Sequence, residues 1–323
     1  MEQKKIYSNI GLSYFLLAAI TLILQLAVGL IIRGTGNRIS GNHILMWILS
    51  IAPMYLVGMP VCVRMLGRLP KKYLYRNRIK AGKWFLYFAI CMFIMYAGNL
   101  VGNAVEAIIS AITGIDMQFQ LQEMISQEPL GIIFLFSVIL APILEELVFW
   151  KALIDRAIVL GDKAVILLSG FLFGLFHGNF YQLFYAFGIG CVFAYIYIRT
   201  GNVKYTISLH MAVNFFGGFL SAIFVKRLDI DMLTNSSVMP GQILAYLTGH
   251  IGILVLYLLY LLCMIALAIT GLVLFIVNMK KAVYRSGEYS LPRRQMAKAM
   301  FGNVGMLLFC AICVVMFAVN MIP

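Results

Sequence analysis

Residues 130–154 read LGIIFLFSVILAPILEELVFWKALI, and this stretch contains both the signal that decides the fold and the first signal of function. It is apolar over more than the roughly 20 residues that a helix needs to cross a bilayer. It also places two adjacent carboxylates, Glu145 and Glu146, near its middle. An ionisable side chain at the bilayer centre costs about 2.5–3.5 kcal/mol on insertion scales. We therefore expect a membrane-spanning helix whose glutamates are there for a functional reason.

The composition of the whole chain agrees with a membrane protein. Of its 323 residues, 63% are hydrophobic and only 11% are charged, and the mean hydropathy is +0.95. This is too little polar surface to cover a globule in water, which excludes a soluble enzyme, a disordered chain and a secreted disulfide scaffold. The six cysteines all fall within apolar runs, so we expect neither disulfides nor a redox site.

The apolar runs predict an all-α fold, a polytopic transmembrane helical bundle of about nine spans. Polar residues concentrate in the middle of the chain, which predicts three regions: an N-terminal scaffold of three spans (1–129), a four-helix functional core (130–225) and two C-terminal helices (226–323). The expected spans are 10–32, 44–65, 84–109, 130–154, 164–180, 183–198, 205–225, 243–279 and 300–322. Because the run 243–279 is too long for one upright span, we expect it to tilt or to include an interfacial turn.

The distribution of the net charge of +13 along the chain indicates membrane topology and not nucleic-acid binding. Basic residues collect in short gaps between apolar runs, most densely in 66–83, whereas the next gap, around Asp116, Glu123 and Glu128, contains no Lys or Arg. Basic gaps stay on the cytoplasmic side of a membrane. We therefore expect an integral membrane protein of a cell membrane, bacterial in origin, with a cytoplasmic N-terminus and no nucleic-acid partner.

Four polar side chains converge on one depth of the predicted bundle. Glu145, His177, His210 and Asn214 each lie within about four residues, or about 6 Å, of the centre of a predicted span. His210 and Asn214 are four residues apart and share one helix face. Glu145 and Glu146 diverge by about 100° around their helix, which suggests one chemical and one supporting role.

Two further ionisable residues receive a different interpretation. Glu106 and His250 lie near the ends of their predicted spans, so we expect both to reach the interface rather than to serve a site. Gly170, Gly174 and Gly178 form a stripe of small residues that allows a neighbouring helix to approach closely. His177 would then lie on a tightly packed helix.

Carboxylates, imidazoles and an amide in a dry pocket are the components of hydrolytic acyl transfer without a covalent nucleophile. A glutamate removed from water becomes a competent general base, and a histidine can share or relay the proton. A second histidine with an asparagine can donate hydrogen bonds to an oxyanion. The same Glu, His and His residues could instead hold zinc, although the sequence has no HExxH motif and no thiol near them.

The order of these residues resembles the CPBP family of intramembrane proteases, which includes CAAX prenyl endopeptidases and bacteriocin-processing or self-immunity proteins. The resemblance covers about residues 130–218 and rests on three motifs: Glu145-Glu146-x-x-Phe149, Phe173-x-x-x-His177 and His210-x-x-x-Asn214. It implies that Glu145 and His177 activate water, with Glu146 supporting them. It implies that His210 and Asn214 form the oxyanion hole. It also implies a glutamate enzyme without a metal or other cofactor, acting on a membrane-associated peptide or protein, with Phe149 and Phe173 as supporting residues.

The sequence departs from the family at Trp150, where the first motif usually has arginine. Lys151 lies about 100° around the helix and cannot simply replace it. Tryptophan offers one N–H where arginine offers a fork of donors, so an ion pair is lost. This departure favours an alternative function, a non-catalytic membrane scaffold or bacteriocin-immunity protein that uses the same cavity for binding. A transporter and simple helix packing by polar residues are further alternatives.

Overall fold

The computed structural model describes residues 2–34, 43–114, 129–228 and 239–321, and every element in these ranges is helical. The acidic gap around residues 116–128 lies outside the described residues. The first part of the chain forms α1 (Glu2–Gly34), α2 (His43–Ala52), η1 (Pro53–Gly58), α3 (Met59–Leu66) and α4 (Ala81–Thr113). The central part forms α6 (Leu130–Ile133), η2 (Phe134–Leu140), α7 (Ala141–Glu145), η3 (Glu146–Ala152), α8 (Leu153–Ala157), η4 (Ile158–Leu160), α9 (Asp162–Phe176), α10 (Phe180–Thr200), α11 (Val203–Val213), η5 (Asn214–Phe219) and α12 (Leu220–Arg227). The last part forms α14 (Pro240–Gly249), α15 (Ile251–Met279), α16 (Arg293–Phe301) and α17 (Val304–Asn320).

The predicted all-α membrane bundle is confirmed. Within the described residues, seven helices are long and apolar enough to cross a bilayer, or eight if the bent pair α16 and α17 counts as one span. The difference from nine is α9, whose 15 residues extend only about 22 Å against a hydrocarbon core of about 30 Å. The expected turn within 243–279 is also present, because the helix breaks at His250 between α14 and α15.

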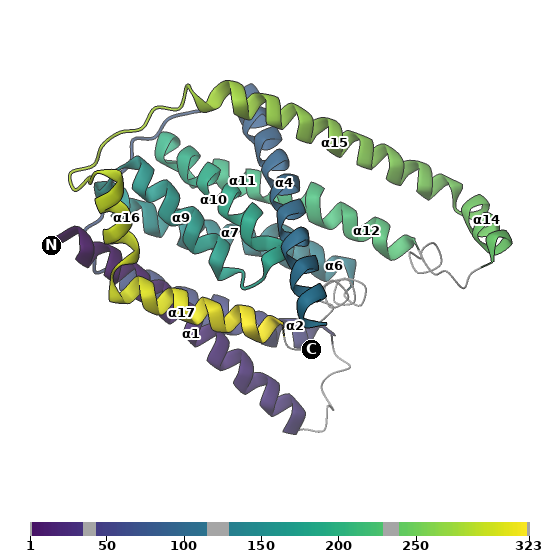
Figure 1. Cartoon of the computed structure of the whole chain (residues 1–323), viewed down its shortest axis with the longest axis horizontal. Coiled ribbons are helices and arrows are strands. Elements are labelled where there is room, and N and C mark those ends of the chain that lie inside the picture. The colour runs from purple at the N-terminus through teal and green to yellow at the C-terminus, as the bar shows by residue number, and fades with distance from the viewer. Residues whose placement is uncertain (1, 35–42, 115–128, 229–238, 322–323) are drawn as a thin grey trace.

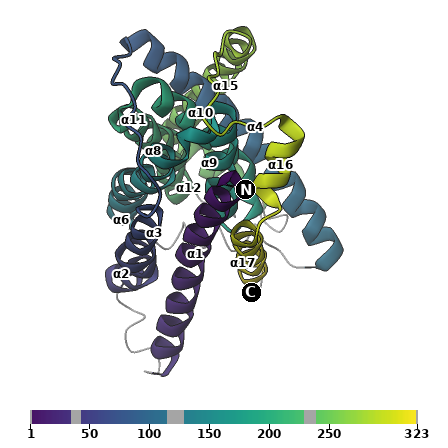
Figure 2. The ribbon, with the colours of Figure 1, turned by 90° about the vertical axis from the view of Figure 1, so that its left-hand side faces the viewer.

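The central helices lie between two pairs of outer helices. Figure 1 shows α1 and α17 side by side along one edge and α15 along the opposite edge, where it meets α4. Figure 2 shows the same separation from the side. Glycines allow both outer pairs to pack at backbone distance: Gly11 of α1 faces the backbone of Met306 in α17, and Gly271 of α15 faces the backbone of Ala89 in α4.

The glycine stripe in α9 packs closely against α10 at two of its three positions. A Cβ at Gly170 would lie 2.6 Å from Phe187 O, and one at Gly174 would lie 2.9 Å from Leu183 O. Gly178 also has a close helical neighbour, but this is α17, where Met316 Cβ would lie 3.2 Å from a Cβ at Gly178; the predicted place of Gly178 within the helix is wrong, because α9 ends at Phe176. Gly178 instead adopts a φ of +66°, which reverses the chain toward α10 and is readily available only to glycine. His177 therefore lies at the end of α9 rather than within it.

The span that contains the two glutamates is one long helix with local widening. Residues 134–140 and 146–152 are π-helical, and Pro142 lies between them at the start of α7. Proline has no N–H and its ring crowds the carbonyl four residues earlier, so the helix widens next to it. A third π-helical stretch begins at Asn214. π-helical turns occur frequently at functional sites, and here they adjoin Glu145, Glu146 and Asn214.

Two non-helical segments, 67–80 and 282–292, are bonded to one end of the central helices. Lys72 N donates to Asp155 O at 2.6 Å, and Asn77 N donates to Thr200 O at 2.8 Å. On the other segment, Tyr289 N donates to Val159 O at 2.8 Å. These segments join the outer helices to the central ones. The orientation of this basic end relative to the cytoplasm and the division of the chain at 129 and 225 stay predictions.

Candidate active site

His210 is the centre of the polar cluster, because both glutamates contact it. On α11, His210 places Nδ1 3.2 Å from Glu146 Oε1 and Nε2 3.7 Å from Glu145 Oε2. The first distance is a hydrogen bond and the second is an ion-pair distance. His210 thus bridges two adjacent carboxylates from a separate helix.

The two glutamates differ sharply in exposure. The side chain of Glu145 is 16% exposed, whereas that of Glu146 is fully buried. Glu146 Oε2 has no hydrogen-bond partner within bonding distance among the described residues. Thr206, on α11, lies beside the same carboxyl, but its hydroxyl donates to Val203 O at 3.0 Å. The more open carboxyl is therefore Glu145. The difference in exposure agrees with the different directions in which the two adjacent side chains leave the helix.

Thr206 is a neighbour of the site that the sequence analysis missed. It is fully buried and lies four residues before His210, as Asn214 lies four residues after it. Three polar side chains at this spacing share one helix face, so the same signal that identified His210 and Asn214 was available for Thr206.

His177 is held in one orientation by the end of α9. Its Nδ1 lies 2.8 Å from Phe173 O. Because a carbonyl oxygen can only accept, Nδ1 must carry the hydrogen in this bond, which leaves Nε2 of the neutral ring as an acceptor. Phe173 also packs edge-on against both imidazoles, with ring centroids 4.6 Å from His177 and 5.9 Å from His210.

Asn214 lies one turn beyond His210, at the start of a π-helical stretch. Its Nδ2 donates to Ser137 O at 2.8 Å, on the helix that contains the glutamates. A primary amide has two N–H donors, so this bond uses one and fixes the direction of the other. Asn214 is placed on the expected helix face, but its bond to Ser137 could not be read from the motif.

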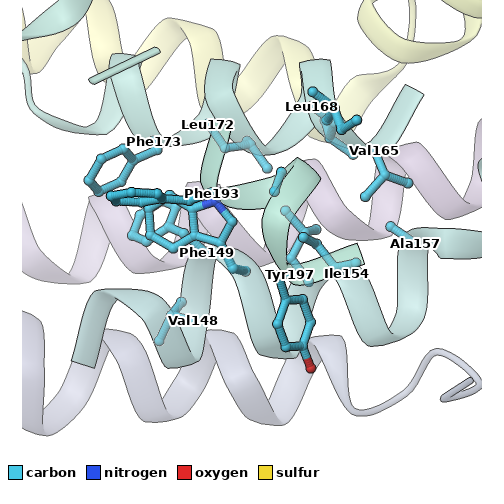
Figure 3. Close-up of a cluster of buried hydrophobic side chains, with 14 of the residues drawn as sticks. Val148, Phe149, Ile154, Ala157, Val165, Leu168, Leu172, Phe173, Phe193 and Tyr197 are labelled. Carbon is cyan, nitrogen blue, oxygen red and sulfur yellow. The ribbon is translucent and has the colours of Figure 1, made fainter. Parts of the chain in front are cut away.

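The aromatic residues Phe149, Trp150 and Phe173 form the apolar wall behind the cluster. Figure 3 shows the rings of Phe149, Phe173 and Phe193 gathered at one end of the buried core, with Ala157 and Val165 toward the other. The rings of Phe149 and Phe173 are 5.2 Å apart, and both side chains are buried. This wall keeps the inner side of the cluster dry.

Trp150, which stands where the family that the sequence resembles usually has arginine, is fully buried. Its Nε1 donates to Gly190 O at 2.9 Å, and its ring centroid lies 6.1 Å from that of His210. Lys151 points elsewhere: its side chain is 42% exposed and pairs with Asp155 at 3.4 Å. As expected, Lys151 does not replace the missing arginine.

No group of three or more His, Cys, Asp or Glu side chains in the described part of the chain is arranged to hold a metal ion. Each nitrogen of His210 faces a carboxylate oxygen, and the assigned nitrogen of His177 faces a backbone carbonyl. Metal independence nevertheless stays a prediction, as does the absence of any cofactor.

Comparison with known proteins places a family domain over this cluster. Residues 127–216 match the family model described as type II CAAX prenyl endopeptidase Rce1-like. The matched segment contains Glu145, Glu146, His177, His210 and Asn214. No curated protein and no solved structure matches the chain.

Proposed function

Because residues 127–216 match the Rce1-like model of the CPBP type, we propose that this protein is an intramembrane endopeptidase. It hydrolyses a peptide bond with water activated by Glu145 and His177, and His210 and Asn214 stabilise the oxyanion. The observation that carries the proposal is the placement of two carboxylates against the two nitrogens of His210 in an otherwise apolar bundle. Structural packing alone would be served at lower cost by neutral polar side chains.

Glu145 is the general base in this mechanism. Its side chain is the more open of the two carboxyls, so a substrate and a water molecule can approach it, whereas Glu146 is enclosed. His177 supports the same step because its Nδ1 hydrogen is bound to Phe173 O and its Nε2 is available to accept a proton.

Glu146 has the supporting role, and it acts through His210. A fully buried carboxyl with an oxygen that lacks a hydrogen-bond partner is less costly in its neutral form. A neutral Glu146 donates from Oε1 to Nδ1 of His210, which places the histidine hydrogen on Nε2, toward Glu145. That N–H and the second N–H of Asn214 are the two donors that meet the oxyanion.

The reaction balances without a cofactor. Water oxygen forms a bond to the scissile carbonyl carbon as Glu145 takes a water proton, and the carbonyl π electrons move to the oxygen. When the oxyanion collapses, the C–N bond breaks and the nitrogen receives the proton through Glu145 or His177. The products are a carboxylic acid and an amine, and Glu145 returns to its starting form.

The substrate class follows from the location of the cluster within the bundle. The peptide must reach a site lined by membrane helices, so we propose a membrane-associated peptide or protein. The matched family is described as a CAAX prenyl endopeptidase, which makes a prenylated C-terminal peptide the first substrate to test.

The test uses the full-length protein in nanodiscs with fluorogenic peptides that carry or lack a prenylated cysteine. Glu145→Gln keeps the shape of the side chain and removes the base, so we expect a loss of about 10³-fold or more in kcat/KM. Glu288→Gln is the control, because Glu288 is a half-exposed glutamate in the segment 282–292, and we expect it to stay within about twofold. Equal cleavage by Glu145→Gln and wild type would reject the active-site assignment.

Two further measurements refine the same experiment. Dialysis against a chelator, with the metal content measured afterwards, should leave the rate unchanged if no metal takes part. Mass-spectrometric mapping of the products from membranes with wild-type or Glu145→Gln protein identifies the cleaved bond.

A non-catalytic scaffold or immunity protein is the second candidate, and Trp150 is the observation that favours it. Trp150 places a ring at the arginine position, and its N–H donates to Gly190 O. No cation therefore supports the glutamates from that position. Complementation separates the two functions: a Glu145→Gln protein that still confers the cellular phenotype of wild type would favour binding over cleavage.

A further inference from the structure

The turn that carries His177 is bonded to the beginning of the next helix. Asn179 caps α10 by accepting from Gln182 N at 2.8 Å, and its Nδ2 donates back to His177 O at 3.0 Å. Between them, Gly178 has the positive φ that reverses the chain. The backbone of His177 is therefore connected to the start of α10 through the Asn179 side chain.

Glu106, on α4, holds the start of α10 from outside. Its Oε1 accepts from Tyr181 N at 2.9 Å, and the residue is only 5% exposed. Glu106 is therefore enclosed between α4 and α10, and its depth relative to the membrane interface stays a prediction. A carboxylate is favoured at a helix N-terminus, where backbone N–H groups lack partners and the helix dipole is positive. Gly102 makes the bond possible, because α4 touches Phe180 O there and a Cβ would lie 2.5 Å from that oxygen.

The same turn has a second support from α17. Asn320 Nδ2 donates to Gly178 O at 3.0 Å. Glu106 and Asn320 both lie outside the matched segment 127–216. The two outer helices α4 and α17 thus contact the His177 turn from separate directions.

We propose that Glu106 is a positioning residue for His177. It fixes the N-terminus of α10, Asn179 transmits that position to the His177 backbone, and the Nδ1 bond to Phe173 O then sets the direction of the free Nε2. The inference rests on the proposed role of His177 in water activation, and it assigns part of the machinery to a helix outside the matched domain.

The size of the expected effect follows from the geometry of proton transfer. A displacement of about 1 Å at a reacting group can cost about 100-fold in rate. For Glu106→Ala we expect kcat to fall by about 10- to 100-fold with KM changed less than about twofold, since the substitution removes no residue of the proposed catalytic cluster. Glu106→Gln keeps an oxygen that can accept from Tyr181 N, so we expect it to restore kcat to within about threefold of wild type.

A matched control lies one turn earlier on the same helix. Asn103 Nδ2 donates to Asn99 Oδ1 at 2.9 Å, so Asn103→Ala removes a polar contact of α4 without touching Tyr181. We expect wild-type kcat for Asn103→Ala. Thermal unfolding of each variant shows whether a loss of rate accompanies a general loss of structure.

A second readout does not depend on cleavage. The chain has 4 histidines, so ring ¹⁵N spectra of histidine-labelled protein in micelles can be assigned with His177→Gln. In wild type, Asn103→Ala and Glu106→Gln we expect His177 with Nδ1 protonated. In Glu106→Ala we expect shifts that move toward a mixture of the two tautomers.

These measurements separate the inference from the function on which it rests. If wild type cleaves no peptide, the proposed function fails, and the ¹⁵N shifts still decide whether Glu106 fixes His177. Unchanged kcat and unchanged shifts in Glu106→Ala would overturn the inference, as would a Glu106→Gln protein as impaired as Glu106→Ala. If Glu106→Ala does not fold, Asn179→Ala breaks the next bond in the series and should show the same losses. Wild-type kcat and shifts in Asn179→Ala would overturn the inference equally.

Discussion

α10 and α15 are both long apolar helices, yet α10 lies among other helices and α15 lies on the outside of the protein, with few of its residues buried. The most apolar part of α15 has a hydropathy of 2.7 and is 6% buried within the protein, whereas that of α10 has a hydropathy of 1.5 and is 44% buried. The less apolar helix is therefore the one inside. In lipid, apolar side chains gain little by leaving the solvent, so association depends on close packing and polar contacts.

The difference shows what each kind of residue contributes. Large aliphatic residues keep α15 in the membrane, and it packs on α4 where Gly271 removes the side chain. Glycines and polar groups place α10 among its neighbours, through Gly170 and Gly174 of α9, Glu106 of α4 and the N–H of Trp150. Away from the contact at Gly271, substitutions that act on packing or polar contacts should therefore affect α10 much more than α15.

The largest difference between the two helices is expected when a side chain is added at a glycine. Gly170→Val places methyl groups against Phe187 O and the side chain of Cys191, so we expect a destabilisation of about 3 kcal/mol or more because backbone cannot move aside easily. Gly252→Val in α15 is the matched control, because no atom lies within 4 Å of a Cβ there. Unfolding in mixed micelles of rising denaturing detergent measures both. Similar stabilities for the two variants would show that close packing does not distinguish the helices.

A smaller effect is expected from the buried hydrogen bond of Trp150. Trp150→Phe removes the N–H that reaches Gly190 O and should cost about 1–2 kcal/mol. Thr270→Val on α15 is the comparison, since Thr270 is exposed and bonds only within its own helix, to Ala266 O; we expect less than about 0.5 kcal/mol there. The same unfolding assay applies. A cost at Thr270 that equals the cost at Trp150 would contradict a special role for interhelical polar contacts.

The smallest effect should come from the ion pair between the two non-helical segments. Glu288 Oε2 lies 2.6 Å from Lys72 Nζ, and this lysine lowers the pKa of the exposed Glu288 carboxyl. A lowered folded-state pKa stabilises the fold above the ordinary glutamate pKa, and the contribution is lost as the pH falls through the lowered value. Exposed pairs contribute little, so Glu288→Gln should differ slightly from wild type at pH 7, and this difference should shrink as the pH falls through the lowered pKa. A difference that grows as the pH falls would reverse the sign of this linkage.

The sequence predicted positions along the helices well and neighbours across helices poorly. Hydropathy located the membrane helices, and the four-residue spacing placed His210 and Asn214 on one face, since both depend on local periodicity. Glu106 was assigned to the interface from its distance along α4, and its rotation and neighbour were not predicted. The bond to Tyr181 N depends on the close approach of α4 and α10 at Gly102, which no local pattern encodes.

The turn at Gly178 and the partner of Asn214 escaped prediction for related reasons. The glycine spacing continues through Gly178, so periodicity extended α9 by one turn beyond its real end at Phe176. Asn214 Nδ2 reaches the carbonyl of Ser137, 77 residues earlier in the chain. Such contacts follow from the assembled bundle and not from either segment alone.

The packing of α1 against α17 has a consequence for the order of assembly during synthesis. Gly305 N donates to Ser8 Oγ across a separation of 297 residues, and the glycines of both helices bring their backbones together. Because α1 is synthesised before α17, its glycine face cannot pack against α17 until that helix emerges. Contacts between segments so distant in sequence form late. Because α17 also bonds the turn after His177, the candidate site reaches its final geometry only when the last described helix has joined the first.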